Sequence, residues 1–450
     1  MAKTLHTLEL ADLDGPLHER LANAIADAIE EGRFQDDGRL PTHRELSRMA
    51  AVSIGTVTKA IDLLSARGVV RGEVGRGTFI IGTPSTTRSG VVDLSLNIPP
   101  PVIPESAMVA ASERAARRAL AIPAGGLYDL KGTQEQRGVL SQWLARSRVD
   151  LSPDALVLCV GAQQAIHLSF SDLRTRSTLI ASESETFSGA IAAAANLGME
   201  WLPIPHDDEG MLPDKLDKAL AASGCKIIYA IPVCHNPLGF EVGLNRRQAI
   251  LKVAQKHDAY IVEDDIYGIY AAKHAPTYKE LDPARVYYLT SLSKCLTPLL
   301  RVGVLAPPEE RLNGICRELR AQVFGAAPVS LELACALIDL GADREAAEAL
   351  VKEAKLRTEI AKEILRLAHV PMPTGAPHLW LPMHATEAER LARRAAEQGI
   401  RVTPPDAGSI GPEKSSGLRL SILAPTTRYD MEGALRQLLR LMDDPEEIVV

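Results

Sequence analysis

Apolar and polar residues are patterned in two ways over the first 82 positions of the chain. Apolar side chains spaced three or four apart predict three short helices: one that runs to about Glu31, one that begins after Pro41 and one that begins at Ser53. Two apolar runs, residues 69–71 and 78–81, flank a glycine-containing turn and predict a hairpin. Three small helices followed by a hairpin are the components of a winged helix-turn-helix domain.

From about Val91 to Val450 the pattern is different, because short β-branched runs alternate with helical segments. These runs lie at residues 155–160, 178–181, 226–231, 259–262, 286–290 and 302–305. They are typical of a buried, largely parallel sheet in an α/β fold. A polar stretch without periodicity at residues 83–90 separates the two patterns, and we interpret it as a linker. The predicted domains are therefore 1–82 and 91–450.

Composition fits a folded protein and indicates no function by itself. The 450 residues are 46% hydrophobic and 24% charged. No apolar stretch has the length of a signal peptide or a membrane span. The six cysteines form no C-x-x-C pair, which predicts free thiols in a reducing compartment. We therefore expect a cytoplasmic protein with no membrane contact and no metal site.

Net charge divides the first domain into two parts. The whole chain carries −7, which by itself argues against nucleic acid as a partner. Residues 1–37 hold three Lys and Arg against nine Asp and Glu, whereas residues 38–82 hold seven against three. The positive excess lies on the second helix, the third helix and the hairpin, where it can neutralise DNA phosphates. Charge alone fits a solvated surface equally well.

Three stretches of the first domain, in order, resemble the DNA-binding domain of the GntR family. They are Arg39-Leu-Pro-Thr-His-Arg-Glu-Leu-Ser-Arg-Met-Ala, Val52-Ser-Ile-Gly-Thr-Val-Thr-Lys-Ala and Gly75-Arg-Gly-Thr-Phe-Ile. The resemblance implies promoter double-stranded DNA as a partner, bound by Arg44, Ser53, Thr56, Thr58, Lys59, Gly75 and Arg76. Many relatives carry Arg where this chain has Ile54, so their base-reading rules do not transfer. Ser53 also has a simple structural role, because serine caps helices with or without DNA.

Side chains that suit a pyridoxal phosphate (PLP) site follow the predicted strands of the second domain. Lys294 can form a Schiff base with an aldehyde, and Asp264 can keep a pyridine nitrogen protonated. Asn236 can donate to a ring oxygen, and Phe187 can stack on a ring. A phosphate can be held by an arginine, a hydroxyl and the backbone N–H groups of a helix N-terminus, here Arg301, Ser291, Gly161, Ala162 and Gln163. Each residue alone has an ordinary structural explanation, and the pattern rests on their occurrence together at strand ends.

Together these residues resemble the fold-type I aminotransferases, over essentially all of residues 91–450. The resemblance implies PLP as cofactor, Lys294 as the Schiff-base lysine, Asp264 as the pyridinium partner, and Asn236 and Tyr267 as donors to the ring oxygen. It implies that Phe187 stacks on the ring, where the family usually has Tyr or Trp. The implied phosphate ligands are Arg301, Ser291, Gly161, Ala162 and Gln163.

Two further residues of the second domain match the aminotransferase pattern. Tyr128 resembles the tyrosine that reaches the phosphate of the neighbouring subunit, which implies a homodimer. Arg419 matches the C-terminal arginine that binds a substrate carboxylate in a fork of hydrogen bonds. The structural alternative for Arg419 is a surface ion pair.

A GntR-type domain joined to an aminotransferase-like domain resembles the MocR (GabR-like) transcriptional regulators. This implies a PLP-dependent transcription factor in which a small amino compound, the effector, forms an external aldimine at Lys294 and changes promoter binding. Residual or half transamination is compatible with that role. The alternative is a working aminotransferase with an appended winged-helix domain. The effector, the target genes and the sign of regulation are not encoded in these motifs.

Overall fold

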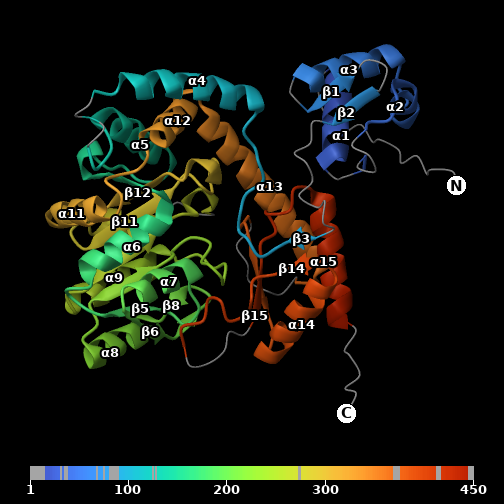
Figure 1. Ribbon diagram of the computed structural model, residues 1–450. Helices are drawn as coiled ribbons and strands as arrows, with labels where there is room; N and C mark the ends of the chain where they lie inside the picture. The colour runs from blue at the N-terminus through green and yellow to red at the C-terminus, as the bar shows by residue number, and fades with distance from the viewer. Residues whose placement is uncertain are drawn as a thin grey trace. The chain divides into compact units, whose positions relative to one another are not determined.

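The structure is a computed structural model, and it divides the chain into two compact units. The first unit comprises residues 1–92 together with 425–450, and the second comprises residues 93–424 (Figure 1). The linker predicted at residues 83–90 lies outside the described residues. The structure describes residues 16–30, 33–34, 39–66, 69–73, 77–80, 91–123, 126, 129–271, 275–367, 375–411 and 417–443.

The first unit contains the predicted three helices and hairpin. These elements are α1 (Leu17–Glu30), α2 (His43–Met49), α3 (Ile54–Ala66) and the antiparallel strands β1 (Val70–Glu73) and β2 (Gly77–Ile80). Thr42 and Glu45 form the reciprocal hydrogen bonds of a capping box at the start of α2. Leu21, Leu46 and Leu64, from the three helices, are fully buried in one core. Helix α15 (Arg428–Asp443) belongs to the same unit.

The second unit is built on a seven-stranded sheet in the order β4-β12-β11-β10-β9-β5-β6. The strands are β4 (Val157–Cys159), β5 (Leu179–Glu183), β6 (Glu200–Ile204), β9 (Ile227–Ala230), β10 (Tyr260–Asp264), β11 (Val286–Ser291) and β12 (Gly303–Ala306). β12 runs antiparallel to both neighbours, and the pairs among β11, β10, β9, β5 and β6 are parallel. The six predicted runs are all strands of this sheet. β6 was not predicted, because this edge strand is only partly buried and carries Pro203.

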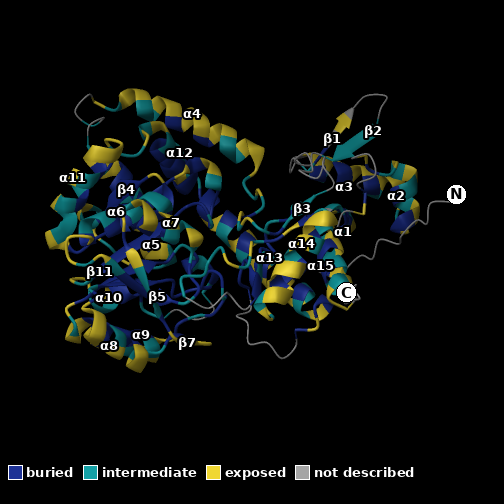
Figure 2. Cartoon of the chain, turned by 60° about the horizontal axis from the view of Figure 1, so that its bottom comes forward, coloured by how far each residue is buried: buried dark blue, intermediate teal, exposed yellow. Residues whose placement is uncertain are grey.

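Helices cover both faces of the sheet, and alternate strand residues face opposite layers. In β9, Ile227 and Tyr229 join one buried cluster, whereas Ile228 and Ala230 join another. The first cluster includes side chains of α6 (Gly161–Leu173), α7 (Ser188–Asn196) and α11 (Leu312–Gln322). The opposite face packs against α8 (Pro213–Ser223), α9 (Leu244–Lys256), α10 (Tyr278–Leu281), α5 (Gln134–Ser147) and α12 (Pro328–Asp339), with α4 (Glu105–Ala121) packed on α12. The buried interior is dark blue in Figure 2.

Smaller elements include two further pairs of strands and two helices. The strand β13 (Leu379–Pro382) pairs with β15 (Gly417–Leu420), and β14 (Ile400–Arg401) pairs with β3 (Val92–Asp93). Helices α13 (Ala342–Ile364) and α14 (Ala385–Glu397) belong to the same part of the chain. Among the described residues, no helix combines the length and the apolar character needed to cross a membrane. All six cysteines are free thiols.

Candidate functional site

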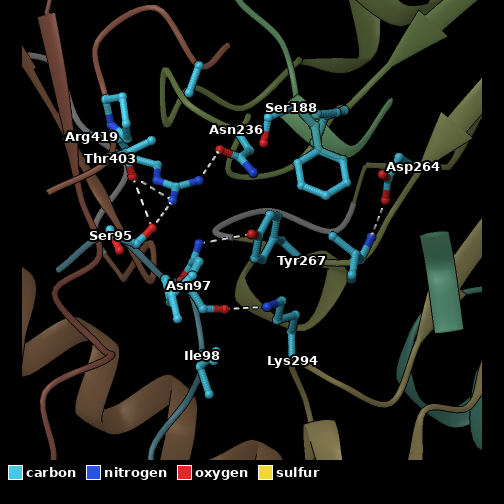
Figure 3. Close-up of a pocket in the computed structure, with 16 residues that line it drawn as sticks. Ser95, Asn97, Ile98, Ser188, Asn236, Asp264, Tyr267, Lys294, Thr403 and Arg419 are labelled. Carbon is cyan, nitrogen blue, oxygen red and sulfur yellow. Dashed lines mark hydrogen bonds between the residues drawn. The ribbon is translucent and has the colours of Figure 1, made fainter. Parts of the chain in front are cut away.

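A cavity of about 380 Å³ lies within the second unit, among residues that follow its parallel strands. Parallel strands end at one edge of a sheet, so polar groups that follow them gather there. Figure 3 shows its lining side chains, which converge from the sheet, from residues 95–98 and from β15. Six sequence-predicted residues line this cavity: Phe187, Asn236, Asp264, Tyr267, Lys294 and Arg419.

Three consecutive carboxylates at the end of β10 have three different surroundings. Asp264 lines the cavity and accepts a hydrogen bond of 2.7 Å from the buried Tyr229 hydroxyl. Burial raises the pKa of Asp264 to about 6, and the Tyr229 bond opposes that increase. Glu263 instead accepts two backbone N–H groups of α10, at 2.9 and 3.0 Å. Asp265 pairs with the buried Arg148 guanidinium at 2.8 Å. Only Asp264 of the three lines the cavity.

Lys294 extends from the segment after β11 toward the backbone of residues 95–98. Its Nζ donates to the Asn97 carbonyl oxygen (Figure 3). Burial, together with the positive charges of Arg419 and Arg301, lowers the pKa of Lys294 to about 8. A buried amine with a lowered pKa is a better nucleophile near neutral pH, since more of it is uncharged.

Asn97 and His378 were not predicted, yet they connect the site residues. The Asn97 amide nitrogen is 2.9 Å from the Tyr267 hydroxyl, to which it donates, and 2.8 Å from His378 Nδ1. His378 Nε2 is 3.0 Å from the carbonyl oxygen of His235 and donates to it, which leaves Nδ1 as the acceptor. Burial lowers the pKa of His378 to about 3, so the ring is neutral. The chain of bonds fixes the orientation of the Tyr267 hydroxyl.

The Arg419 guanidinium is held inside the cavity rather than in a surface ion pair. Nη1 donates to Asn236 Oδ1 at 2.7 Å, and Nη2 donates to Thr403 Oγ1 at 2.8 Å and to the carbonyl oxygen of Ser95. Nε is buried and makes no hydrogen bond within the described part of the chain. All three acceptors are neutral, so no anion among the described residues is hydrogen-bonded to the Arg419 guanidinium. Ser95 and Thr403 were also not predicted.

A second group of predicted residues gathers where β4, β12 and β11 lie side by side. The strand register aligns Ser291 with Gly303, and Gly303 with Cys159, two residues before Gly161 begins α6. Gly161 has a positive φ of 72°, and a Cβ placed on it would be 3.2 Å from Arg301 Nη2. A Cβ on Gly303 would lie 2.4 Å from the Gly161 carbonyl carbon. Gly303 therefore allows a backbone approach that a side chain would block, and Gly161 adopts a backbone conformation that other residues rarely adopt.

The remaining predicted residues at this edge lie on the first turn of α6. Ala162 is buried, and Gln163 Nε2 donates to the Gly189 carbonyl oxygen at 2.6 Å. The Phe187 ring packs beside Gly189, where a Cβ would lie 2.4 Å from the ring. Tyr128 lies outside the described residues.

The described candidates for DNA contact lie on α2, on α3 and at Ser53, directly before α3. Arg44 and Lys59 are exposed. The Ser53 hydroxyl caps α3 by accepting the backbone N–H of Thr56 at 3.1 Å, and the Thr58 hydroxyl donates to the Ile54 carbonyl oxygen at 3.1 Å. Gly75 and Arg76 lie outside the described residues.

Comparisons with known proteins match both parts of the chain. The family model for aminotransferase class I and II matches residues 89–438, and the model for bacterial regulatory proteins of the gntR family matches residues 17–80. The Bacillus subtilis protein YdfD, an uncharacterized HTH-type transcriptional regulator, is 26% identical over 90% of this chain and 92% of its own length. MocR of Rhizobium meliloti, a probable rhizopine catabolism regulatory protein, is 26% identical over 87% of each chain.

A solved structure supports the fold. LysN, an alpha-aminoadipate aminotransferase from Thermus thermophilus solved with N-(5'-phosphopyridoxyl)-L-leucine, superimposes with a TM-score of 0.69 at 23% identity. The match covers 79% of this chain and 92% of that one. This chain belongs to the aminotransferase class I and II family and carries a GntR-family helix-turn-helix domain on its N-terminal side.

Proposed function

We propose that this protein is a PLP-dependent, DNA-binding transcriptional regulator that binds a small amino compound at Lys294 and thereby changes its binding to promoter DNA. The observation that carries the proposal is the presence, in one chain, of a GntR-family domain and of a cavity where Lys294, Asp264 and Arg419 converge. We assign DNA binding to residues 1–82, linker function to 83–90, and cofactor binding, effector binding and dimerisation to 91–450. A DNA-binding role implies a cytoplasmic location.

The residues of the second unit fit PLP. Asp264 offers a buried carboxylate for the pyridine nitrogen, and Tyr267 and the Asn236 amide nitrogen offer hydrogen bonds to the ring oxygen. The backbone N–H groups at the start of α6, from Gly161 onward, would bind the phosphate, with Arg301 next to Gly161 and Ser291 paired with Gly303 on the neighbouring strand. Ala162 and Gln163 would contribute the next N–H groups of α6, and Phe187 would cover the ring. When bound, PLP supplies an aldehyde that reacts reversibly with amines.

Arg419 is suited to hold an acidic group of the effector. Its charge is buried, lacks a hydrogen-bonded anion and retains an unpaired Nε donor among the described residues. A planar guanidinium binds a carboxylate with two parallel hydrogen bonds. The effector would therefore carry an amino group for the Lys294 side of the cavity and an acidic group for Arg419.

The segment Ser95–Ile98 offers a route from the cavity to the first domain. The carbonyl oxygens of Ser95 and Asn97 accept hydrogen bonds from Arg419 and Lys294, respectively. Ligands that engage these two cations compete for those bonds. In sequence, the segment follows β3 and the linker at residues 83–90. If a ligand changes which conformation this segment favours, the change would pass along the chain through β3 to the linker.

Exposed apolar side chains support a homodimer. Leu120 is 89% exposed and Leu299 is 80% exposed, with Phe324 and Val329 also exposed. Large apolar residues are costly to leave in water and are enriched at interfaces. Tyr128 is proposed to reach the phosphate of the partner's cofactor.

The test measures DNA binding and amino-group transfer on the same full-length, PLP-loaded protein. We expect salt-sensitive, sequence-selective binding to a promoter fragment, with an affinity that changes when the effector is added. Lys294→Ala should abolish both the PLP absorbance band of the protein and the effector response, while DNA binding persists. Lys252→Ala, on the exposed surface of α9, is the matched control and should change neither.

The competing function is that of a working aminotransferase. The residues of the site would permit this function as well. Two results together would overturn the regulator proposal. One is steady-state amino transfer to a 2-oxo acid at about 1 s⁻¹ or faster, which is within ordinary enzyme turnover. The other is the lack of selective DNA binding.

A further inference from the structure

The first residue of α3 presents an unusual side chain to solvent. Ile54 is 49% exposed, although Val57, Ile61 and Leu64 of the same helix are buried in the core of the domain and Leu63 is partly buried. Residues three or four apart share a helix face. Ile54 shares a face with both the buried Val57 and the exposed Thr58, so it lies at the edge of the exposed face, next to Gly55.

The hydroxyl groups on this part of α3 are already bonded within the domain. Ser53 Oγ lies 2.8 Å from Thr56 Oγ1 and accepts the Thr56 backbone N–H. Thr58 Oγ1 donates to the Ile54 carbonyl oxygen and lies 3.4 Å from His43 Nδ1. The group that the first turn offers outward, within the described part of the domain, is the hydrocarbon side chain of Ile54.

Gly55, next to Ile54, is not required by packing or by backbone conformation. A Cβ at this position would meet only Ser53 Oγ, at 3.8 Å, and its φ is not positive. Glycine is among the least favourable residues in a helix. Its effect here is to leave the backbone of the first turn open to a close approach from outside.

We propose that Ile54 reads a thymine by packing on its 5-methyl group in the major groove, and that Gly55 allows the first turn of α3 to approach the base pair. This rests on the DNA binding proposed above. All four bases present hydrogen-bonding groups in the major groove, and only thymine adds a methyl group there. Exposed Arg44 and Lys59 and the net positive charge of residues 38–82 favour nucleic acid over an apolar protein surface as the partner.

The experiment uses the full-length, PLP-loaded protein. A preferred duplex is selected from a random pool, and each thymine is then replaced singly by uracil, which removes the methyl group alone. We expect a loss of about 3- to 10-fold in affinity at one thymine of each half-site, the scale of one buried methyl group per site. Ile54→Ala removes the contact at both half-sites of the proposed homodimer, so it should lose about 10- to 100-fold on thymine DNA, the product of the two half-site losses. It should also become insensitive to the uracil exchange at that position. Ile54→Val, which keeps branched methyl groups, should retain most of the sensitivity.

Leu17→Ala is the matched control, because Leu17 is also a 44% exposed apolar residue at the start of a helix of this unit. It should alter neither affinity nor uracil sensitivity. Gly55→Ala should weaken DNA binding by about 10-fold while leaving the thermal unfolding midpoint unchanged or higher, since alanine favours the helix.

The outcomes separate the two proposals. Two results would overturn the Ile54 assignment and leave the regulator proposal standing. In the first, DNA binding is selective but no single uracil exchange lowers the affinity. In the second, Ile54→Ala is as sensitive to the uracil exchange as the unaltered protein. Unchanged affinity in Gly55→Ala overturns the close approach. A complete absence of selective DNA binding overturns the regulator proposal and the Ile54 assignment with it.

Discussion

Replacing Tyr229 with phenylalanine removes one hydroxyl group that hydrogen-bonds to Asp264 and leaves the ring in place. The ring packs edge-on against Phe170 and Trp201, with centroid distances of 5.7 and 6.1 Å, and those contacts do not involve the hydroxyl. The hydroxyl donates to Asp264 Oδ2 at 2.7 Å. The substitution therefore tests how Asp264 is kept ionised in a buried site.

The magnitude follows from the strength of that bond. A hydrogen bond to a buried charged group contributes about 1.5–3 kcal/mol, which corresponds to a rise of about one to two pH units in the pKa of Asp264. The pKa of Asp264 is about 6 with the bond present. At pH 9 the carboxyl is ionised in both proteins. As the pH falls, the phenylalanine variant is protonated first, so the affinity ratio grows toward about 10- to 100-fold at pH 5.

Equilibrium binding of PLP to the cofactor-free chain, followed by absorbance from pH 5 to pH 9, measures this ratio. The titrations of PLP and of Lys294 are shared by both proteins and cancel in the ratio. Tyr288→Phe is the matched control, because it removes an equally buried hydroxyl that donates to the neighbouring Asp265 at 3.1 Å, a carboxylate that does not line the cavity. A ratio for Tyr229→Phe that does not vary with pH, or a Tyr288→Phe ratio that varies in the same way, would refute the reasoning.

Three other substitutions probe separate parts of the molecule. Arg419→Lys should weaken effector binding by about 30-fold or more while PLP absorbance is retained, because lysine cannot reproduce the two-pronged hydrogen bonding; a loss below 3-fold in a spectroscopic titration would contradict the assignment. Gly303→Ala places a Cβ 2.4 Å from the Gly161 backbone and should lower the free energy of unfolding by about 1–3 kcal/mol, measured by denaturant titration; no change would show that the backbone yields freely. Lys59→Ala should reduce the slope of log affinity for DNA against log salt by about one for each protomer bound, and an unchanged slope would place the phosphate contacts elsewhere.

Sequence patterns predicted the parts of the site that lie next to regular elements. Asp264 and Lys294 follow buried strands, so their strand-end positions were predictable and both line the cavity. Arg301 precedes a strand instead. It reaches the same sheet edge because β12 runs antiparallel to its neighbours, a reversal that a run of apolar residues does not encode.

The rest of the site depends on contacts between distant parts of the chain. Asn97 meets Lys294 and His378 across 197 and 281 residues, respectively. Neither Asn97 nor His378 lies in a motif, and an isolated Asn or His is most often a structural residue. Tyr229 was part of a predicted strand, but its hydroxyl partner depends on which face of the sheet it occupies. Such pairings follow from tertiary packing rather than from local spacing.

The three acids that end β10 impose a length constraint on the protein. Because side chains alternate across a strand, inserting or deleting one residue within β10 would turn Asp264 away from the cavity and bring Glu263 or Asp265 into its place. If Glu263 moved, the backbone of α10 would lose the carboxylate that accepts its N–H groups. If Asp265 moved, Arg148 would lose its ion-pair partner. Evolutionary gains and losses of single residues should therefore accumulate in the loops around this sheet and be absent from β10, even where its apolar residues exchange freely.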